Sequence, residues 1–196
     1  MDLYRKLIAE KLSGLSDDKN IVFSLLICEK LLPNYKCFSV KYNFGDAEQL
    51  KSIISDLYSN LLAENIKYDI NQYISKVDSI TPNTEDFDAI YASFALDACT
   101  AILSTLQFIK NKDINDVIDV AIYARDTVDM YILERNDLAN NNNLVLLIEH
   151  NFFMLAEKKR QLDVIDFLKK LEVINEQGLE ELRLIGNLKI IDLDLL

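Results

Sequence analysis

Apolar residues along most of this chain recur with the spacing of an α-helix. The clearest case is the segment 47–64, where the apolar positions from Leu50 to Leu62 follow the 3.6-residue repeat without a miss. Residues that start and stop helices divide the rest of the chain into further helices. These are predicted at 2–13, 17–32, 34–44, 69–80, 113–136, 144–172 and 176–185, while the tail 187–196 is given no state.

Several boundaries depend on single residues. Pro33 is expected to break or restart the helix that precedes it, because proline has no N–H to donate within a helix. Gly45 is expected to end the next helix in the left-handed conformation, and Asp46 with Gln49 forms a capping box for the helix after that. The apolar phase is lost at 157–161, which predicts a kink or two helices within 144–172.

The most apolar continuous segment, 86–110, is predicted to be a buried helix around which the others pack. Its polar residues recur at spacings of four and three, so they form one narrow stripe that a neighbouring helix can approach closely. The stripe consists of Ser93, Asp97, Thr100, Ser104 and Gln107. The segment has the length of a membrane span, but its polar residues and its lack of a basic flank favour a core helix.

Composition supports this architecture. Half of the 196 residues are hydrophobic, and only four are Gly and two Pro, which argues against an all-β or a disordered chain. We therefore expect an all-α single domain, 1–196, with about eight or nine helices around the helix 86–110. The net charge of −11 argues against nucleic acid and anionic membranes as partners, and it favours solubility or a basic protein partner.

The three cysteines lie in apolar runs without metal-ligand spacing. Cys28, Cys37 and Cys99 are therefore predicted to be reduced thiols of a cytoplasmic protein, with no disulfide framework and no zinc site. The N-terminal segment 1–10 opens as an amphipathic helix without a cleavable apolar core, so no signal peptide is expected.

Four charged residues stand on or beside apolar helix faces. Arg125 lies near the centre of the apolar stripe of its helix, and Asp129 follows one turn later. Asp97 and Glu29 are the other misplaced charges. The sequence predicts that Glu29, Asp97, Arg125 and Asp129 form a buried polar cluster that fixes the register of three helices. Alternatively, three carboxylates against one arginine leave room for a bound cation or a water-filled cleft.

Few residues indicate catalysis. Carboxylate pairs such as Asp126 with Asp129 and Glu85 with Asp88 have the spacing of a magnesium-dependent enzyme built on helices, but such pairs are common on acidic helices. His150 is the only histidine, and a solvated or hydrogen-bonded imidazole is the expected state. The sequence predicts no catalytic residues, no metal site and no cofactor.

Several short motifs together resemble a known family. They are Cys28-Glu29, Leu32-Pro33-Asn34-Tyr35, Phe44-Gly45-Asp46, Asp86-Phe87-Asp88, Asp97-Ala98-Cys99 and the run 124–131, Ala-Arg-Asp-Thr-Val-Asp-Met-Tyr. This pattern is similar to that of the YjaG-like family of bacterial proteins, domain of unknown function 416, over about residues 5–190. The resemblance implies a cytoplasmic, all-helical, single-domain protein, and it implies no activity.

The function predicted from these features is a non-catalytic binding or regulatory module. One alternative is an acidic immunity or inhibitor protein for a basic toxin, since an anionic surface attracts a cationic target. The other alternative is the divalent-cation-dependent enzyme. The expected partner is a protein, basic in the inhibitor case, and a homodimer through an exposed apolar helix face is a further expectation.

Overall fold

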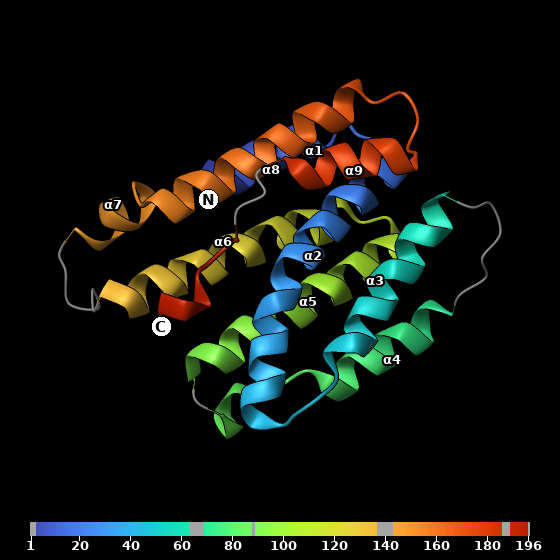
Figure 1. The fold of residues 1–196 in the computed structure, drawn as a ribbon. Coiled ribbons are helices and arrows are strands. Elements are labelled where there is room, and N and C mark those ends of the chain that lie inside the picture. The colour runs from blue at the N-terminus through green and yellow to red at the C-terminus, as the bar shows by residue number, and fades with distance from the viewer. Residues whose placement is uncertain (1–2, 63–68, 88, 137–142, 186–188, 196) are drawn as a thin grey trace.

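The computed structural model describes residues 3–62, 69–87, 89–136, 143–185 and 189–195 (Figure 1). Nine α-helices make up most of these ranges, and no strand occurs within them. The helices are α1 Leu3–Leu12, α2 Asp17–Tyr42, α3 Ala47–Leu62, α4 Ile70–Ile80, α5 Ala89–Asn111, α6 Ile114–Asn136, α7 Leu144–Glu149, α8 Phe152–Lys170 and α9 Glu176–Leu184. Two short 3₁₀ turns, η1 Thr84–Asp86 and η2 Leu193–Leu195, complete the elements. The predicted all-α class is confirmed.

Helix α5 is the centre of the fold, as the sequence predicted. Its most extensive contacts are with α2 and α6, and Figure 1 shows α2 crossing α5, with α3 and α4 on one side. Helices α1 and α8 pack on α6. The buried apolar side chains of the described helices form one contiguous core, which includes Phe94, Ala98 and Ile102 of α5. Burial of this core is the main favourable term in folding.

The polar stripe of α5 faces α6. The Thr127 hydroxyl on α6 donates a hydrogen bond to Asp97 Oδ2 at 2.7 Å. A hydrogen bond with Ser104 lowers the pKa of Tyr123, although burial of the phenol raises that pKa overall. The small side chains of the stripe therefore let α6 approach closely while its hydroxyl groups remain paired.

The break predicted at Pro33 is wrong, because α2 continues through it from Asp17 to Tyr42. Proline within a helix costs roughly 3 kcal/mol, since it leaves the carbonyl four residues earlier without a donor. Packing on both sides of Pro33 offsets this cost, because Leu31, Tyr35 and Phe38 are all fully buried. The burial of one long helix therefore outweighs the local preference of proline.

The end of α2 also differs from the prediction. The residue that caps the helix in the left-handed conformation is Asn43, with φ of 49°, and Gly45 takes its own positive φ of 68° two residues later. The prediction for the next helix is confirmed, because Asp46 Oδ1 accepts hydrogen bonds from the backbone N–H groups of Glu48 and Gln49 at 2.9 and 3.2 Å.

Helix α5 begins three residues later than predicted. Residues 84–86 form the turn η1. The Asn83 side chain caps its start, because Asn83 Oδ1 accepts a hydrogen bond from the Glu85 N–H at 3.2 Å. The segment Ile90–Asn111 of α5 is long and apolar enough to cross a membrane. More than half of its most apolar stretch is buried in the fold, and the core helix of a soluble protein has the same length and composition.

The sequence predicted either a kink or two helices within 144–172. The structure has two helices there, but the break between them is not at 157–161. Helix α7 ends at Glu149 and α8 begins at Phe152, with the Asn151 side chain accepting the Phe153 N–H at 3.0 Å as a cap. Helix α8 then runs without interruption through 157–161. Three of the polar residues there, Glu157, Arg160 and Gln161, are buried and hydrogen-bonded, which is why the apolar phase is lost without a kink.

Some sequence predictions fall outside the described residues. These include the end of the predicted helix 47–64, Asp88 and most of the loop Asn140–Asn143, of which only Asn143 is described. In the tail, Ile190 and Ile191 are buried.

Exposed apolar side chains concentrate at α7 and the start of α8. Val145, Leu146, Leu147, Phe152 and Leu155 are 43% to 72% exposed. Where such side chains form a contiguous patch, the patch often marks a contact with another chain. A homodimer through this face stays a prediction.

Candidate functional site

A groove of about 1070 Å³ opens between α2, α3, α8, α9 and the residues after 188. Its walls are mainly apolar: Leu26 comes from α2, Ile54 from α3, Val164 from α8, Leu179 from α9, and Ile190 and Ile191 from the C-terminal segment. These elements are distant in sequence, so the groove exists only because the helices pack around α2. It is larger than a second hollow, of about 760 Å³, beside α7 and the start of α8.

Helix α2 contributes polar side chains to the groove. Lys30, Asn34 and Cys37 follow one another at spacings of four and three, which places them on one face of the helix. All three line the groove, and Pro33 lies beside them. Since Pro33 has no N–H, the carbonyl of Glu29 loses its usual helical partner at this point of the wall.

An ion pair closes one end of the groove and joins three helices. The Arg183 guanidinium of α9 donates to both carboxylate oxygens of Glu29 on α2, with Nη2 3.0 Å from Oε1. Tyr58 of α3 donates its hydroxyl to Glu29 Oε2 at 3.2 Å, and its ring lies 4.7 Å below the Arg183 guanidinium. Burial, and then the Glu29 charge, raise the pKa of Tyr58. The cation that contacts Glu29 is therefore Arg183 and not Arg125.

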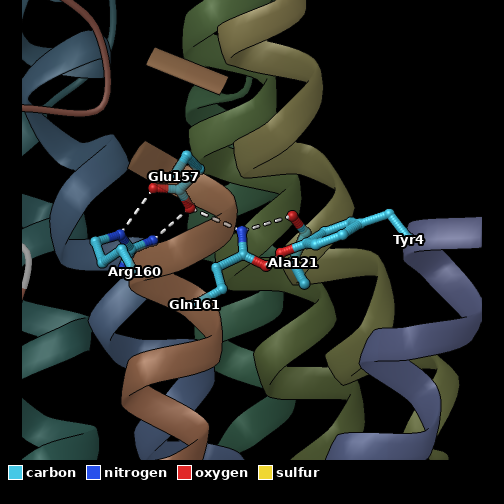
Figure 2. A network of polar contacts seen from close by, with 5 residues as sticks. All are labelled: Tyr4, Ala121, Glu157, Arg160 and Gln161. Atoms are coloured by element: carbon cyan, nitrogen blue, oxygen red, sulfur yellow. Dashed lines mark hydrogen bonds and ion pairs between the residues drawn. The ribbon is translucent and has the colours of Figure 1, made fainter. Parts of the chain in front are cut away.

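Arg160, which lines the groove, belongs to a buried ion pair that the sequence analysis did not select (Figure 2). Glu157 and Arg160 lie one turn apart on α8, and their side chains are 2% and 5% exposed. Arg160 Nε donates to Glu157 Oε2 at 2.7 Å, and Nη2 donates to Oε1 at 2.5 Å. This two-point contact fixes the plane of the guanidinium.

The pair extends into a network across three helices (Figure 2). Gln161 Nε2 donates to Glu157 Oε1 at 2.7 Å and to the carbonyl of Ala121 on α6 at 3.0 Å. The Tyr4 hydroxyl of α1 donates to Gln161 Oε1 at 2.8 Å. The network thus fixes how α1, α6 and α8 pack, which is the role predicted for the Arg125 cluster.

Two hydrogen-bond donors of the groove-lining residues have no acceptor among the described residues. Asn34 is only 4% exposed, and its buried Nδ2 has no partner. Arg160 uses Nε and Nη2 on Glu157, and its third nitrogen, Nη1, makes no hydrogen bond there and is not fully buried. Buried donors are nearly always paired, so Asn34 Nδ2 in particular is available to a bound molecule.

Charged groups surround Lys30 in this part of the groove. Burial lowers the pKa of Lys30, and the neighbouring Arg160 charge lowers it further, whereas Glu157 and Glu29 raise it. The two carboxylates already accept hydrogen bonds from Arg160 and Arg183. Lys30 and Arg160 line the groove, whereas Glu157 lies behind the lining.

The four residues of the predicted cluster divide among three places, and all four are half-buried. Glu29 belongs to the groove. Arg125 lies 5.9 Å from the Tyr4 ring, and its charge lowers the pKa of Asp129, which burial raises overall. Arg125 and Asp129 are therefore neighbours on α6, as predicted, whereas Asp97 contacts Thr127 between α5 and α6.

We expect the stability of the protein to depend on pH through Asp97. Burial raises the pKa of this carboxyl from 3.8 to about 7, although the Thr127 hydrogen bond lowers it and Asp126 raises it. A folded pKa above the unfolded one adds stability that is complete below pH 4 and is lost as pH rises through about 7. Asp97→Asn should therefore gain about 1 to 3 kcal/mol over the native chain at pH 8 and nothing at pH 4.

Urea denaturation between these pH values measures the effect. Thr127→Val, which removes the hydrogen bond that lowers the pKa, should move the midpoint of the native pH profile upward. If Asp97→Asn leaves the pH dependence of the unfolding free energy unchanged, then a group other than Asp97 causes that dependence.

The remaining candidates for chemistry stand apart from one another. Among the described residues, no group of three or more His, Cys, Asp or Glu side chains is placed to hold a metal ion. His150 is exposed and forms a hydrogen bond between Nδ1 and the Leu146 carbonyl at 2.8 Å. Burial raises the pKa of Cys28 and of Cys99 to about 12, as their apolar surroundings predicted.

The acidic surface expected to attract a basic partner is partly neutralised. On α6, Asp119 forms an ion pair with Arg5 of α1 at 2.6 Å. Asp113 and Glu134 are exposed. The basic protein partner stays a prediction.

The described residues form an all-helical protein with a large, mainly apolar groove. The chain belongs to the DUF416 family, described as a protein of unknown function, whose family model matches residues 7–187. The expected family membership is confirmed. The matched range agrees with residues 5–190, over which the sequence motifs resemble this family.

Relatives of known structure or sequence support the same assignment. A crystal structure of a DUF416 family protein from Shewanella baltica OS155 has the same fold, with a TM-score of 0.81 and 24% identity over 93% of this chain and 92% of that one. The uncharacterized protein YjaG of Escherichia coli is 27% identical over 92 residues, which is 47% of either chain. An uncharacterized protein of Haemophilus influenzae is 22% identical over 63% of this chain and 64% of its own. The two curated relatives are thus matched over less than two thirds of their length.

Proposed function

We propose that this DUF416 protein is a non-catalytic binding module and that its binding site is the groove between α2, α3, α8 and α9. The main support for this proposal is the presence of the groove. Its volume of about 1070 Å³ is at the upper end of the range for small-molecule sites, and such sites are mainly apolar with a few fixed polar groups.

The polar groups of the groove are arranged for holding a ligand. Glu29 is fixed by Arg183 and Tyr58, and Arg160 is fixed by Glu157. Ion pairs of this kind keep side chains in one geometry and oppose changes of protonation. A rigid, pre-formed site reduces the entropy lost on binding. This arrangement supports binding without chemistry on the ligand.

Cys37 provides a reporter for the groove in the native chain. It is half-buried and lines the groove, whereas Cys28 and Cys99 are buried and have raised pKa values. A disulfide reagent such as dithionitrobenzoate should therefore react first with Cys37. A molecule bound in the groove should slow this reaction, and straight-chain decyl compounds serve as simple apolar probes.

A groove-filling substitution tests the proposal. Ser55 and Ser52 are both exposed on α3, but only Ser55 lines the groove. Ser55→Trp should abolish the binding of decyl probes measured by calorimetry, and Ser52→Trp should leave it unchanged. Equal loss in both variants, or no binding to the native chain, would overturn the groove as the binding site.

A further inference from the structure

The inner end of the groove offers donors that need an acceptor from outside the chain. Arg160 and Asn34 both line the groove, and neither Arg160 Nη1 nor Asn34 Nδ2 meets an acceptor among the described residues. Asn34 Nδ2 is fully buried, and a buried donor without an acceptor destabilises the fold. A carboxylate accepts only, through two oxygens with about four lone-pair positions, so one such group can pair with both donors.

The cations beside these donors favour an anion. Lys30 and Arg160 both line the groove and lie within electrostatic range of each other, and Glu157, the partner of Arg160, is not part of the lining. A cationic head group would meet Arg160 and Lys30 at close range, which is unfavourable in a partly dry site.

The position of Arg160 is set before any ligand arrives. Its side chain is 95% buried, and two of its nitrogens are held by Glu157, whose Oε1 is in turn held by Gln161 (Figure 2). The guanidinium therefore loses little rotamer freedom when a ligand binds. Charge-assisted hydrogen bonds from such a pre-organised group are among the stronger contacts available to a protein.

From these contacts we infer that the groove binds a small amphipathic monoanion. Its carboxylate-type head lies against Arg160, Asn34 and Lys30, and its apolar body lies along Ile54, Leu179 and Ile190. The inference rests on the proposed function, because it specifies the ligand class of the same groove. It adds a requirement for negative charge that an apolar groove alone does not impose.

Three probes with the same apolar chain test the head group. Decanoate is anionic, decanol is neutral and decyltrimethylammonium is cationic. Calorimetry should show that decanoate binds at least about tenfold more tightly than decanol, as expected for one hydrogen bond to a charged group. Decyltrimethylammonium should bind more weakly than decanol, and decanoate should protect Cys37 at the lowest concentration.

Two lysines of the groove provide matched variants. Lys30 is half-buried at the inner end, and Lys51 is exposed at the rim, where it pairs with Glu48 at 3.5 Å. Lys30→Met should weaken decanoate binding about tenfold and leave decanol unchanged. Lys51→Met should change decanoate binding by less than about threefold. Thermal melting confirms that each variant is folded before binding is measured.

The outcomes separate this inference from the proposed function. If decanol binds as tightly as decanoate, and Ser55→Trp blocks both, then the groove is a binding site but the inferred anion is wrong. Tighter binding of decyltrimethylammonium also overturns the inference. If none of the three probes binds, both the proposed function and the inference are overturned.

Discussion

Glu157→Gln should lower the free energy of unfolding by about 3 to 5 kcal/mol, because it leaves the buried Arg160 charge without a counter-ion. Glu157 and Arg160 are 2% and 5% exposed at the side chain, so water does not replace the lost carboxylate. The change also replaces one carboxylate oxygen by an amide NH₂ group, so Arg160 and Gln161, which donate to both oxygens of Glu157, are left with a single acceptor oxygen. Urea denaturation monitored by circular dichroism measures the loss.

Two comparisons identify the cause. Asp163→Asn breaks an exposed pair with Lys159 on the same helix and should cost at most about 1 kcal/mol. The double variant Glu157→Leu with Arg160→Met removes both charges, so it should be more stable than Glu157→Gln alone. A loss for Glu157→Gln no larger than for Asp163→Asn would mean that the pair is hydrated in solution.

The helical framework was predictable because burial selects a 3.6-residue repeat in almost every element. Where a local rule competed with packing, packing prevailed. Pro33 was expected to end a helix, yet α2 passes through it because apolar residues are buried on both sides of it. The position of that boundary depends on tertiary contacts with α5 and α3, which no local pattern contains.

The buried network could have been found with the criterion that selected Arg125. Met154, Glu157, Gln161, Val164 and Leu168 follow spacings of three and four, so Glu157 and Gln161 lie on the apolar face of α8. The sequence analysis instead interpreted the polar run 157–161 as a break. A polar residue in phase with an apolar stripe indicates a buried partner, whereas a break changes the phase of the stripe itself.

The groove could not be derived from the sequence. It depends on the distance between α3 and α9, which are separated by more than a hundred residues, and on the side chains of the C-terminal segment. Glu29 was selected as an unusual charge, but its partner Arg183 comes from a helix that showed no unusual feature. Periodicity identifies which face of a helix is buried, and it does not identify which helix covers that face.

Gly45→Ala should lower the free energy of unfolding by about 2 to 4 kcal/mol, from left-handed backbone strain and from overpacking. Gly45 has a φ of 68°, and a Cβ added there would lie 1.9 Å from the Tyr35 hydroxyl oxygen. That hydroxyl is buried and donates to the carbonyl of Ile80 at 2.8 Å, so it has no room to move away. The glycine therefore allows α2 to contact the end of α4.

The backbone strain and the steric clash can be separated with Tyr35→Phe, which removes the hydroxyl oxygen that the alanine methyl group at position 45 would contact. If the clash dominates, Gly45→Ala should cost at least about 1 kcal/mol less in the Tyr35→Phe chain than in the native chain. Strictly additive losses would assign the whole effect to the positive φ. Gly14→Ala is the control, because a Cβ at Gly14 meets nothing within 4 Å and its φ is not left-handed. We expect that change to stay within about 0.5 kcal/mol, as for other surface positions without a special backbone conformation.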